Sequence, residues 1–140
     1  RLGVGPWELQ FQYGPHGKPE LTAPWARRRF SFSVSHSGEV GAILLLEMDQ
    51  GRTTFASPVG VDLEERRQRP FGRLARRYFT EAEAKILENE EKVAEKFFDM
   101  WTKKEAWLKT LGTGLAGGLA SLDTVAGGDI ETSQQDQQDP

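Results

Sequence analysis

The spacing of apolar residues changes partway along this chain of 140 residues, from every second position to a helical repeat. Residues 7–13 and 30–34 alternate apolar and polar side chains, as half-buried strands do, and residues 40–48 form an apolar run of strand length. The strongest helical repeat covers residues 93–111, where one apolar stripe recurs along the segment. Strands followed by helices, with short hairpin connections, predict an α+β fold.

Local signals predict several shorter elements. Residues 53–56 and 59–63 have the composition of two short strands, and residues 71–78 that of a short arginine-rich helix. Thr80 begins a capping box, with a glutamate three positions later, which predicts the start of a helix over residues 81–88.

The composition excludes several classes of protein. The chain contains no Cys, which excludes a disulfide framework and a thiolate metal site. Its longest apolar run, residues 42–46, is too short to cross a bilayer, and its formal net charge of -3 argues against a general nucleic-acid binder. Because no apolar signal segment follows Arg1, we expect a cytoplasmic protein. Residues 132–140 lack apolar side chains, and we expect them to form a frayed polar tail.

Two carboxylates stand close together after the predicted strands. Asp62 and Glu64 are two positions apart, so on a strand both side chains point to the same face. Adjacent carboxylates repel each other unless a cation shares their site, and oxygen ligands of this kind suit Mg²⁺. The alternative is a strand end whose acids are solvated, and spacing alone leaves both interpretations open.

A third carboxylate lies on the long predicted helix. Glu105 is one helical turn before Lys109, at the edge of the apolar stripe. Such a pair is usually a surface ion pair that stabilises the helix by about a few tenths of a kcal/mol. A functional role requires Glu105 to approach Asp62 and Glu64 in space, which spacing alone does not show.

Taken in order and at their spacing, these motifs resemble the signature of the 4′-phosphopantetheinyl transferase superfamily, in particular its larger surfactin-synthetase-activating type. The resemblance covers residues 7–122 and is carried by five motifs, at residues 17–19, 35–38, 59–64, 98–109 and 112–115. It implies a pseudo-two-fold α+β fold in which antiparallel sheets carry packed helices, here truncated at both ends.

The resemblance also implies a division of the chain. Residues 1–58 would form the C-terminal part of the first pseudo-repeat. Residues 59–131 would form the second pseudo-repeat, which contains the metal site but lacks its final strands. Residues 132–140 would remain a polar tail.

The activity implied by the resemblance is transfer of the 4′-phosphopantetheine arm of coenzyme A to a serine of an apo carrier protein, with release of 3′,5′-ADP. Asp62, Glu64 and Glu105 match the family's magnesium ligands, and Mn²⁺ is an alternative because it also accepts oxygen ligands. Glu105 also matches the proposed general base, with a metal-bound water as the alternative proton acceptor. Lys109 matches a catalytic lysine that holds the phosphates and protonates the departing one.

Contacts to coenzyme A are implied for residues in three motifs. Lys18, Ser35 and His36 match residues at the nucleotide, where an ammonium, a hydroxyl and an imidazole can donate to phosphate oxygens. Lys104 and Lys109 complete the expected coenzyme A contacts. For Lys18 and His36, the alternative is a loop residue without a ligand.

Six arginines lie between residues 66 and 77 of an otherwise acidic chain. They predict either a docking face for an acidic carrier protein or a solvated basic helix, and the charge pattern does not decide between these. The expected partners are an apo acyl or peptidyl carrier protein and coenzyme A, without nucleic acid or membrane, and we expect a monomer. Glu83 matches a further acidic position of the family, but its place in the capping box also accounts for it.

Two other functions remain open from the sequence. One is a non-catalytic carrier-protein-binding module, and the other is an acidic α+β domain whose Lys104–Glu105 helix is only structural. The joint presence of Asp62, Glu64, Glu105 and Lys109 favours the enzyme, because a docking module has no chemical need for all of them.

Overall fold

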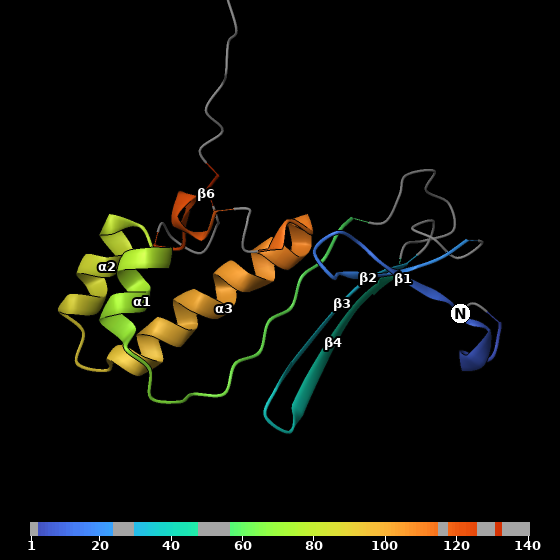
Figure 1. The fold of residues 1–140 in the computed structure, drawn as a ribbon, viewed down its shortest axis with the longest axis horizontal. Helices are drawn as coiled ribbons and strands as arrows, with labels where there is room; N and C mark the ends of the chain where they lie inside the picture. Colours follow the sequence, from blue (N-terminus) through green and yellow to red (C-terminus); the bar gives the residue numbers. More distant parts are fainter. Residues whose placement is uncertain (1–2, 24–29, 48–56, 115–117, 126–130, 133–140) are drawn as a thin grey trace, which may run out of the picture.

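A computed structural model describes residues 3–23, 30–47, 57–114, 118–125 and 131–132 of the chain. Short strands come first and helices follow, as Figure 1 shows. The elements are η1 (Pro6–Glu8), β1 (Phe11–Tyr13), β2 (Pro19–Leu21), β3 (Phe30–Ser37), β4 (Val40–Glu47), α1 (Phe71–Tyr78), α2 (Glu81–Glu88), α3 (Val93–Leu111), η3 (Leu119–Ser121), β5 (Leu122–Asp123) and β6 (Glu131–Thr132). The predicted α+β class is confirmed.

Two antiparallel hairpins precede the helices. β1 pairs with β2, and β3 pairs with β4 from Phe30 opposite Glu47 to Ser37 opposite Val40. The tight turn between β3 and β4 contains Gly38, whose φ of 59° lies in the left-handed region that glycine adopts without steric cost. β3 continues to Ser37, three residues beyond the alternation in residues 30–34, and it buries Ser33 and Ser35 while Val34 is 41% exposed.

Two predicted strands differ from the structure. The strand expected over residues 7–13 is confined to β1, because the chain first makes a short 3-10 turn that starts at Pro6. The Glu8 carboxylate accepts a hydrogen bond from the Gly5 N–H at 2.7 Å and stabilises this turn. Residues 59–63 belong to a connection with no regular secondary structure, and the strand expected over residues 53–56 lies outside the described residues.

The three helices have the bounds that the sequence predicts. The capping box of α2 is confirmed, because Thr80 Oγ1 accepts from the Glu83 N–H at 3.2 Å and the Glu83 carboxylate accepts from the Thr80 N–H at 2.8 Å. α3 ends at Gly112, whose φ of 71° is left-handed and whose N–H donates to the Leu108 carbonyl at 2.8 Å.

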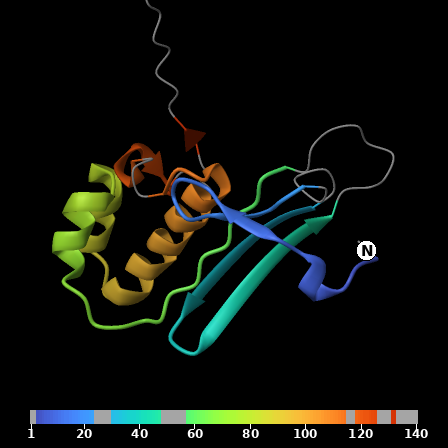
Figure 2. The ribbon, with the colours of Figure 1, turned by 45° about the vertical axis from the view of Figure 1, so that its right-hand side comes forward.

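The hydrophobic core lies among α1, α2 and α3, which Figure 2 shows packed together. Phe97 of α3 is 2% exposed and is surrounded by aromatic rings. Its ring stacks on Phe79 at a centroid distance of 5.1 Å and on Trp101 at 5.7 Å, and it meets Phe98 edge-on at 5.5 Å. Phe98 and Trp101 belong to α3 itself, so the stacking of Phe79 on Phe97 is the contact that joins the end of α1 to α3.

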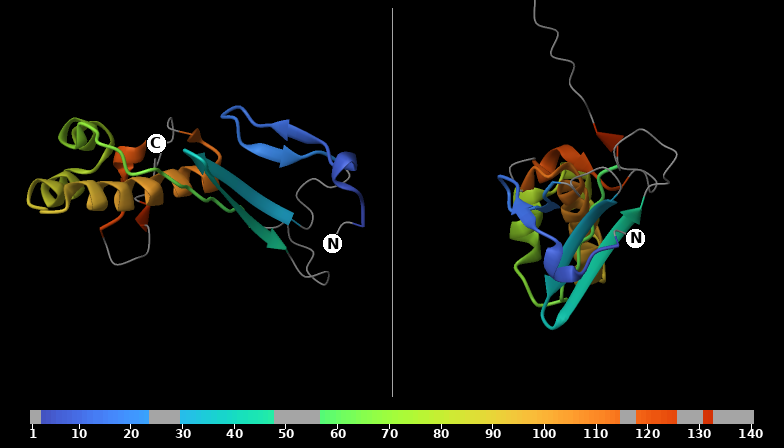
Figure 3. Two further views of the ribbon diagram at one scale, coloured as in Figure 1. Left: turned by 90° about the horizontal axis from the view of Figure 1, so that it is seen from below. Right: turned by 90° about the vertical axis from the view of Figure 1, so that its right-hand side faces the viewer.

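Residues 57–70, called the connection below, lead into α1 and run along α3 before they reach the helical core. Figures 1 and 3 show this extended green segment between the strands on one side and the helices on the other. An ideal Cβ built on Gly60 would lie 1.8 Å from the carbonyl oxygen of Ala106, so the connection touches the backbone of α3 directly. The expected boundary between pseudo-repeats at residue 59 falls in this connection and remains a prediction. Among the described helices, none is long and apolar enough to cross a membrane.

Candidate active site

The three expected metal ligands come from two elements. Asp62 and Glu64 lie on the connection that precedes α1, and Glu105 lies on α3. Burial raises the pKa of Glu105 above its usual value, the charge of Asp62 raises it further, Lys109 opposes these effects, and Glu64 adds a smaller increase. The fold therefore brings the three carboxylates within electrostatic reach of one another.

Only one of the two carboxylate oxygens of Asp62 has hydrogen-bond partners among the described residues. Its side chain is 6% exposed, and its Oδ1 atom accepts hydrogen bonds from Lys109 Nζ at 2.7 Å and from Ser35 Oγ at 3.0 Å. Its Oδ2 atom is buried and has no hydrogen-bond partner among the described residues. A buried carboxylate oxygen without a partner is unfavourable, and a cation or a donor from a ligand would relieve this cost.

The three carboxylates are ligands of the chemical type that a divalent metal ion prefers. In the part of the chain that the structure describes, no three acidic or histidine side chains stand as a group that could hold a metal ion. The unpartnered oxygen of Asp62 is nevertheless a feature that a bound cation would compensate. The same holds for the burial of Glu105 near the charges of Asp62 and Glu64, which together raise its pKa. Three carboxylates are the hard oxygen ligands that Mg²⁺ prefers.

Lys109 joins this carboxylate group to β3. Its ammonium group donates to Asp62 and also to Ser35 Oγ at 2.8 Å, and its side chain is 30% exposed. The ammonium group therefore binds two protein side chains, while part of the lysine side chain remains exposed to solvent. Of the expected catalytic residues, Lys109 and Glu105 both lie on α3, one turn apart, beside Asp62.

The structure places Ser35 and His36 on opposite faces of β3. Ser35 is 6% exposed and points toward Asp62, whereas His36 is exposed, because consecutive side chains of a strand point to opposite sides. The two residues that the resemblance groups at the nucleotide are therefore not brought together. His36 does not share the carboxylate site.

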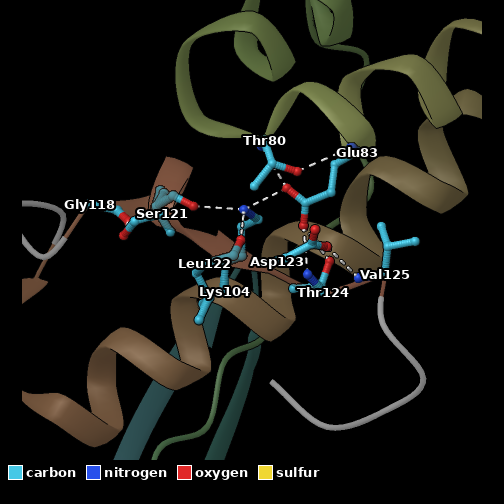
Figure 4. A network of polar contacts seen from close by, with 10 residues as sticks. Thr80, Glu83, Lys104, Gly118, Ser121, Leu122, Asp123, Thr124 and Val125 are labelled. Atoms are coloured by element: carbon cyan, nitrogen blue, oxygen red, sulfur yellow. Dashed lines mark hydrogen bonds and ion pairs between the residues drawn. The ribbon is translucent and has the colours of Figure 1, made fainter. Parts of the chain in front are cut away.

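Lys104 lies away from the carboxylate site and is completely buried. Figure 4 shows its ammonium group in a polar network with Glu83, whose Oε2 atom is 2.6 Å from Lys104 Nζ. Lys104 also donates to the carbonyl oxygen of Leu119 at 2.7 Å and to that of Leu122. An ammonium group has three donors, and these three oxygens use all of them, so none is free for the coenzyme A contact that the resemblance implies. Glu83 is its partner and not a member of the carboxylate site.

Lys18 fixes the first hairpin to the end of α3. Its ammonium group donates to the carbonyl oxygens of Val59 at 3.1 Å, Thr110 at 3.3 Å and Lys109. A cation at the carboxyl end of a helix satisfies carbonyls that lack intrahelical partners and interacts favourably with the helix dipole. The structure thus gives Lys18 a role in holding the hairpin against α3, which the resemblance did not imply.

A small cavity opens beside Glu105 and Lys109. It has a volume of about 140 Å³, and its lining includes His16, Lys18 and Gly114. His16 was not expected from the sequence, although it stands two positions before Lys18 in the same loop. A Cβ built on Gly114 would lie 3.2 Å from the Cβ of His16, so the segment after α3 packs closely on this histidine.

Comparisons with known proteins show which family the chain resembles. Residues 58–139 match the family model described as the 4′-phosphopantetheinyl transferase superfamily. Over 127 residues the chain is 41% identical to a Synechocystis protein named "Putative 4'-phosphopantetheinyl transferase slr0495", a match that covers 85% of this chain and 46% of the relative. It is 33% identical to the 4′-phosphopantetheinyl transferase HetI of Nostoc (82% and 46% covered) and 35% identical to AcpT of Salmonella typhi (87% and 59% covered).

The fold and the matched region define the class of this protein. The chain belongs to the 4′-phosphopantetheinyl transferase superfamily, as its motifs predict. It spans about half the length of the curated relatives that it matches. The matched region contains Asp62, Glu64, Glu105 and Lys109 but not Lys18, Ser35 or His36.

Proposed function

We propose that this chain carries the metal site and part of the coenzyme A site of a 4′-phosphopantetheinyl transferase. The strongest support is the position of Asp62 in a chain of this superfamily. Its Oδ1 atom lies 2.7 Å from Lys109 Nζ, and its charge adds to the effect of burial in raising the pKa of Glu105. The substrates would be coenzyme A and an apo acyl or peptidyl carrier protein. The products would be the modified carrier protein and 3′,5′-ADP.

The reaction exchanges one phosphorus–oxygen bond for another. The oxygen of the carrier serine forms a bond to the phosphorus next to the pantetheine, and the bond from that phosphorus to the bridging oxygen breaks. Asp62, Glu64 and Glu105 would hold Mg²⁺, with Mn²⁺ as the alternative. When bound, the metal supplies positive charge that orients the pyrophosphate and stabilises the departing 3′,5′-ADP.

Glu105 is suited to receive the proton of the attacking serine. The support for this role is its location, because Glu105 lies one helical turn from Lys109 and lines the adjacent cavity. A bound cation would lower the basicity of a carboxylate that holds it, so a metal-bound water is the alternative proton acceptor. Lys109 is suited to contact the departing phosphate, because its ammonium group already lies beside Asp62 and its side chain is partly open to solvent. His16 and Lys18 line the adjacent cavity and would contact the substrate or shape its site.

The exposed arginines of α1 are suited to bind the carrier protein. Arg73, Arg76 and Arg77 are all exposed, and Arg77 lies over the ring of Tyr78 at 5.1 Å. Acidic partners are attracted by such a face, which raises the association rate at low salt. Among the preceding arginines, Arg66 and Arg67 lie beside Glu95 and Glu65 and are partly neutralised. The cytoplasmic location, the monomeric state and the lack of nucleic-acid or membrane partners remain predictions.

Calorimetric titration with coenzyme A, with and without Mg²⁺, tests the proposed site. We expect binding that requires Mg²⁺ and that is lost in Glu105→Gln, which keeps the shape of the side chain but removes its charge. Asp99→Asn is the matched control, because Asp99 lies on the same helix in an exposed ion pair with Lys103. Binding of a carrier protein without Mg²⁺-dependent binding of coenzyme A would instead favour the non-catalytic docking module.

A further inference from the structure

Three serines on one face of β3 hold the connection that carries two of the expected metal ligands. Ser33, Ser35 and Ser37 point to the same side of the strand because side chains alternate. Each hydroxyl accepts a hydrogen bond from a backbone N–H of the connection. The bonds are Val61 N to Ser33 Oγ at 3.1 Å, Leu63 N to Ser35 Oγ at 3.2 Å and Glu65 N to Ser37 Oγ at 2.8 Å. We call these three residues the serine ladder.

The serine ladder also reaches the carboxylates of the connection. Ser35 Oγ donates to Asp62 Oδ1 at 3.0 Å, and Ser37 Oγ donates to Glu64 Oε2 at 3.5 Å. Each of these two serines thus binds the carboxylate of one residue of the connection and the backbone N–H of the next residue of the connection. A single hydroxyl can do both, because it donates one hydrogen bond and accepts two. Side-chain pairing therefore fixes both the backbone and the carboxylates of the connection.

The hydroxyl of Ser35 is fully occupied by protein groups. It accepts from the Leu63 N–H and from Lys109 Nζ, and it donates to Asp62. A serine hydroxyl has one donor and two acceptor sites, so no capacity remains for a phosphate oxygen. This arrangement differs from the nucleotide contact expected for Ser35 and indicates that its hydroxyl acts on the ligand site through Asp62 and Lys109.

The connection is confined from the opposite side by α3. Gly60 abuts the backbone of this helix at Ala106, while Ser33 and Ser35, which are 3% and 6% exposed, hold the next residues of the connection. In this buried setting, removal of one hydroxyl leaves an N–H group or a carboxylate oxygen without its partner. The position of Asp62 therefore depends on contacts made by β3 and by α3 together.

We propose that the serine ladder positions Asp62 and Glu64 for the cation they bind, with Ser35 as its central member. This inference rests on the proposed function, in which Asp62 and Glu64 bind a metal ion. The ladder residues are positioning residues, because they act through the carboxylates. The hydrophobic core cluster among α1, α2 and α3 contains none of the three serines, so a variant of the ladder should keep the helical core.

Amide hydrogen exchange, measured by NMR, tests whether the ladder holds the connection. The N–H groups of Val61, Leu63 and Glu65 should exchange more slowly than those of residues 62 and 64, which have no hydrogen-bond acceptor within the described part of the chain. In Ser35→Ala, we expect the exchange of Leu63 to accelerate roughly fivefold to tenfold, the range expected for one net hydrogen bond. Unchanged exchange at Leu63 would overturn the inference.

Calorimetric titration of the same variants with Mg²⁺ tests the purpose of the ladder. We expect Ser35→Ala to weaken Mg²⁺ binding about fivefold or more, and Ser35→Thr, which retains the hydroxyl, to recover most of it. Ser31→Ala is the matched control, because Ser31 lies on the same strand face but forms no hydrogen bond with residues 59–65, all of which are described. Its Mg²⁺ affinity should equal that of the unchanged protein.

The outcomes separate this inference from the proposed function. If the unchanged chain binds Mg²⁺ and Ser35→Ala binds it equally well, the positioning role is overturned while the proposed function stands. An equal loss of affinity in Ser31→Ala and Ser35→Ala would also overturn the role, because the effect would then belong to the strand in general. If the unchanged chain does not bind Mg²⁺ at all, the proposed metal site itself fails, and exchange at Leu63 still reports whether Ser35 holds the connection.

Discussion

Lys109 Nζ lies 2.7 Å from Asp62 Oδ1 and links α3 to the connection that follows β4. The carboxylate of Asp62 is almost completely buried, whereas the lysine side chain is 30% exposed. The pair therefore places one charge inside the fold and leaves its counterion accessible to a ligand. This relationship is the basis of the proposed site, because it holds Asp62 in a position where its second oxygen has no hydrogen-bond partner among the described residues.

Lys109→Met removes the cation and leaves the buried Asp62 carboxylate without it. We expect the free energy of unfolding in urea to fall by about 1–2 kcal/mol, less than for a fully buried pair because Lys109 is partly exposed. Added Mg²⁺ should stabilise this variant more than the unchanged protein, since it can take the place of the lost positive charge. Lys103→Met, an exposed position on the same helix, should change stability by no more than about 0.5 kcal/mol. Equal effects of the two substitutions would contradict the role of Lys109.

Gly60→Ala tests the close approach of the connection to α3. The added Cβ would lie 1.8 Å from the Ala106 carbonyl oxygen and 2.5 Å from Thr110 Oγ1, so the connection must move away from the helix. We expect a loss of about 2–3 kcal/mol of stability, together with weaker Mg²⁺ binding, because Asp62 moves with the backbone.

Gly72→Ala is the control for this substitution. Gly72 lies in α1, and a Cβ there meets nothing within 4 Å. Replacement by alanine should stabilise the helix by about 0.5–1 kcal/mol. If Gly60→Ala is as well tolerated as Gly72→Ala in thermal unfolding, the connection does not pack on α3 as described.

Glu83 and Lys104 should make stability depend on pH in the acidic range. Burial acts to raise the pKa of Glu83, but hydrogen bonds from Lys104, from Thr124 and from the Thr80 N–H outweigh it, and the net pKa lies below its usual value of 4.5. A carboxylate whose pKa is lower in the folded state stabilises the fold above its unfolded pKa. This stabilisation is lost as the pH falls through the lower, folded pKa.

Urea unfolding at a series of pH values between 7 and 3 measures this effect. The unchanged protein should lose stability more steeply below pH 4.5 than the double variant Glu83→Gln/Lys104→Met. Lys104→Met alone should cost about 3–5 kcal/mol at pH 7, because it leaves a fully buried carboxylate without its cation. Identical pH profiles for the unchanged protein and the double variant would show that this pair does not set the acid sensitivity.

The sequence predicted the helices better than the site. The bounds of α1, α2 and α3 follow from apolar periodicity and from the capping residues Thr80 and Gly112, which are local features of the chain. The strand expected over residues 59–63 is absent because serine side chains, not a neighbouring backbone, bind its N–H groups. This side-chain pairing recurs every second residue, as the pairing of a strand does.

Short-range sequence patterns predicted the carboxylates of the candidate site but not the residues that surround them. Asp62 and Glu64 share a face because of their spacing, whereas the proximity of Glu105 depends on how the connection packs on α3. Lys104 precedes Glu105 directly, yet it points into the core toward Glu83, because adjacent helical positions are about 100° apart around the axis. The roles of Lys18 and His16 depend on contacts between distant segments, which no local pattern indicates.

Substitution of the exposed arginines of α1 tests the docking face. Arg73→Glu combined with Arg76→Glu should raise the KM for an acidic carrier protein about tenfold or more at low salt, because both charges are reversed on an exposed face. The difference should shrink as salt screens the charges. Lys85→Glu combined with Lys103→Glu is the charge-matched control, because both lysines are exposed and lie in ion pairs away from α1. A KM that is unaffected by the double substitution at low salt would contradict docking at this face.

Transfer of a fluorescent coenzyme A analogue to an apo carrier protein tests the central claim most directly. The assay compares the unchanged protein with Glu105→Gln and with the control Asp99→Asn, each with and without Mg²⁺. The proposed site predicts labelling of the carrier serine that requires Mg²⁺, persists in Asp99→Asn and falls at least about a hundredfold in Glu105→Gln. Labelling that is independent of Mg²⁺, or that is equal in Glu105→Gln and Asp99→Asn, would contradict the assignment of Asp62, Glu64 and Glu105 to the active site.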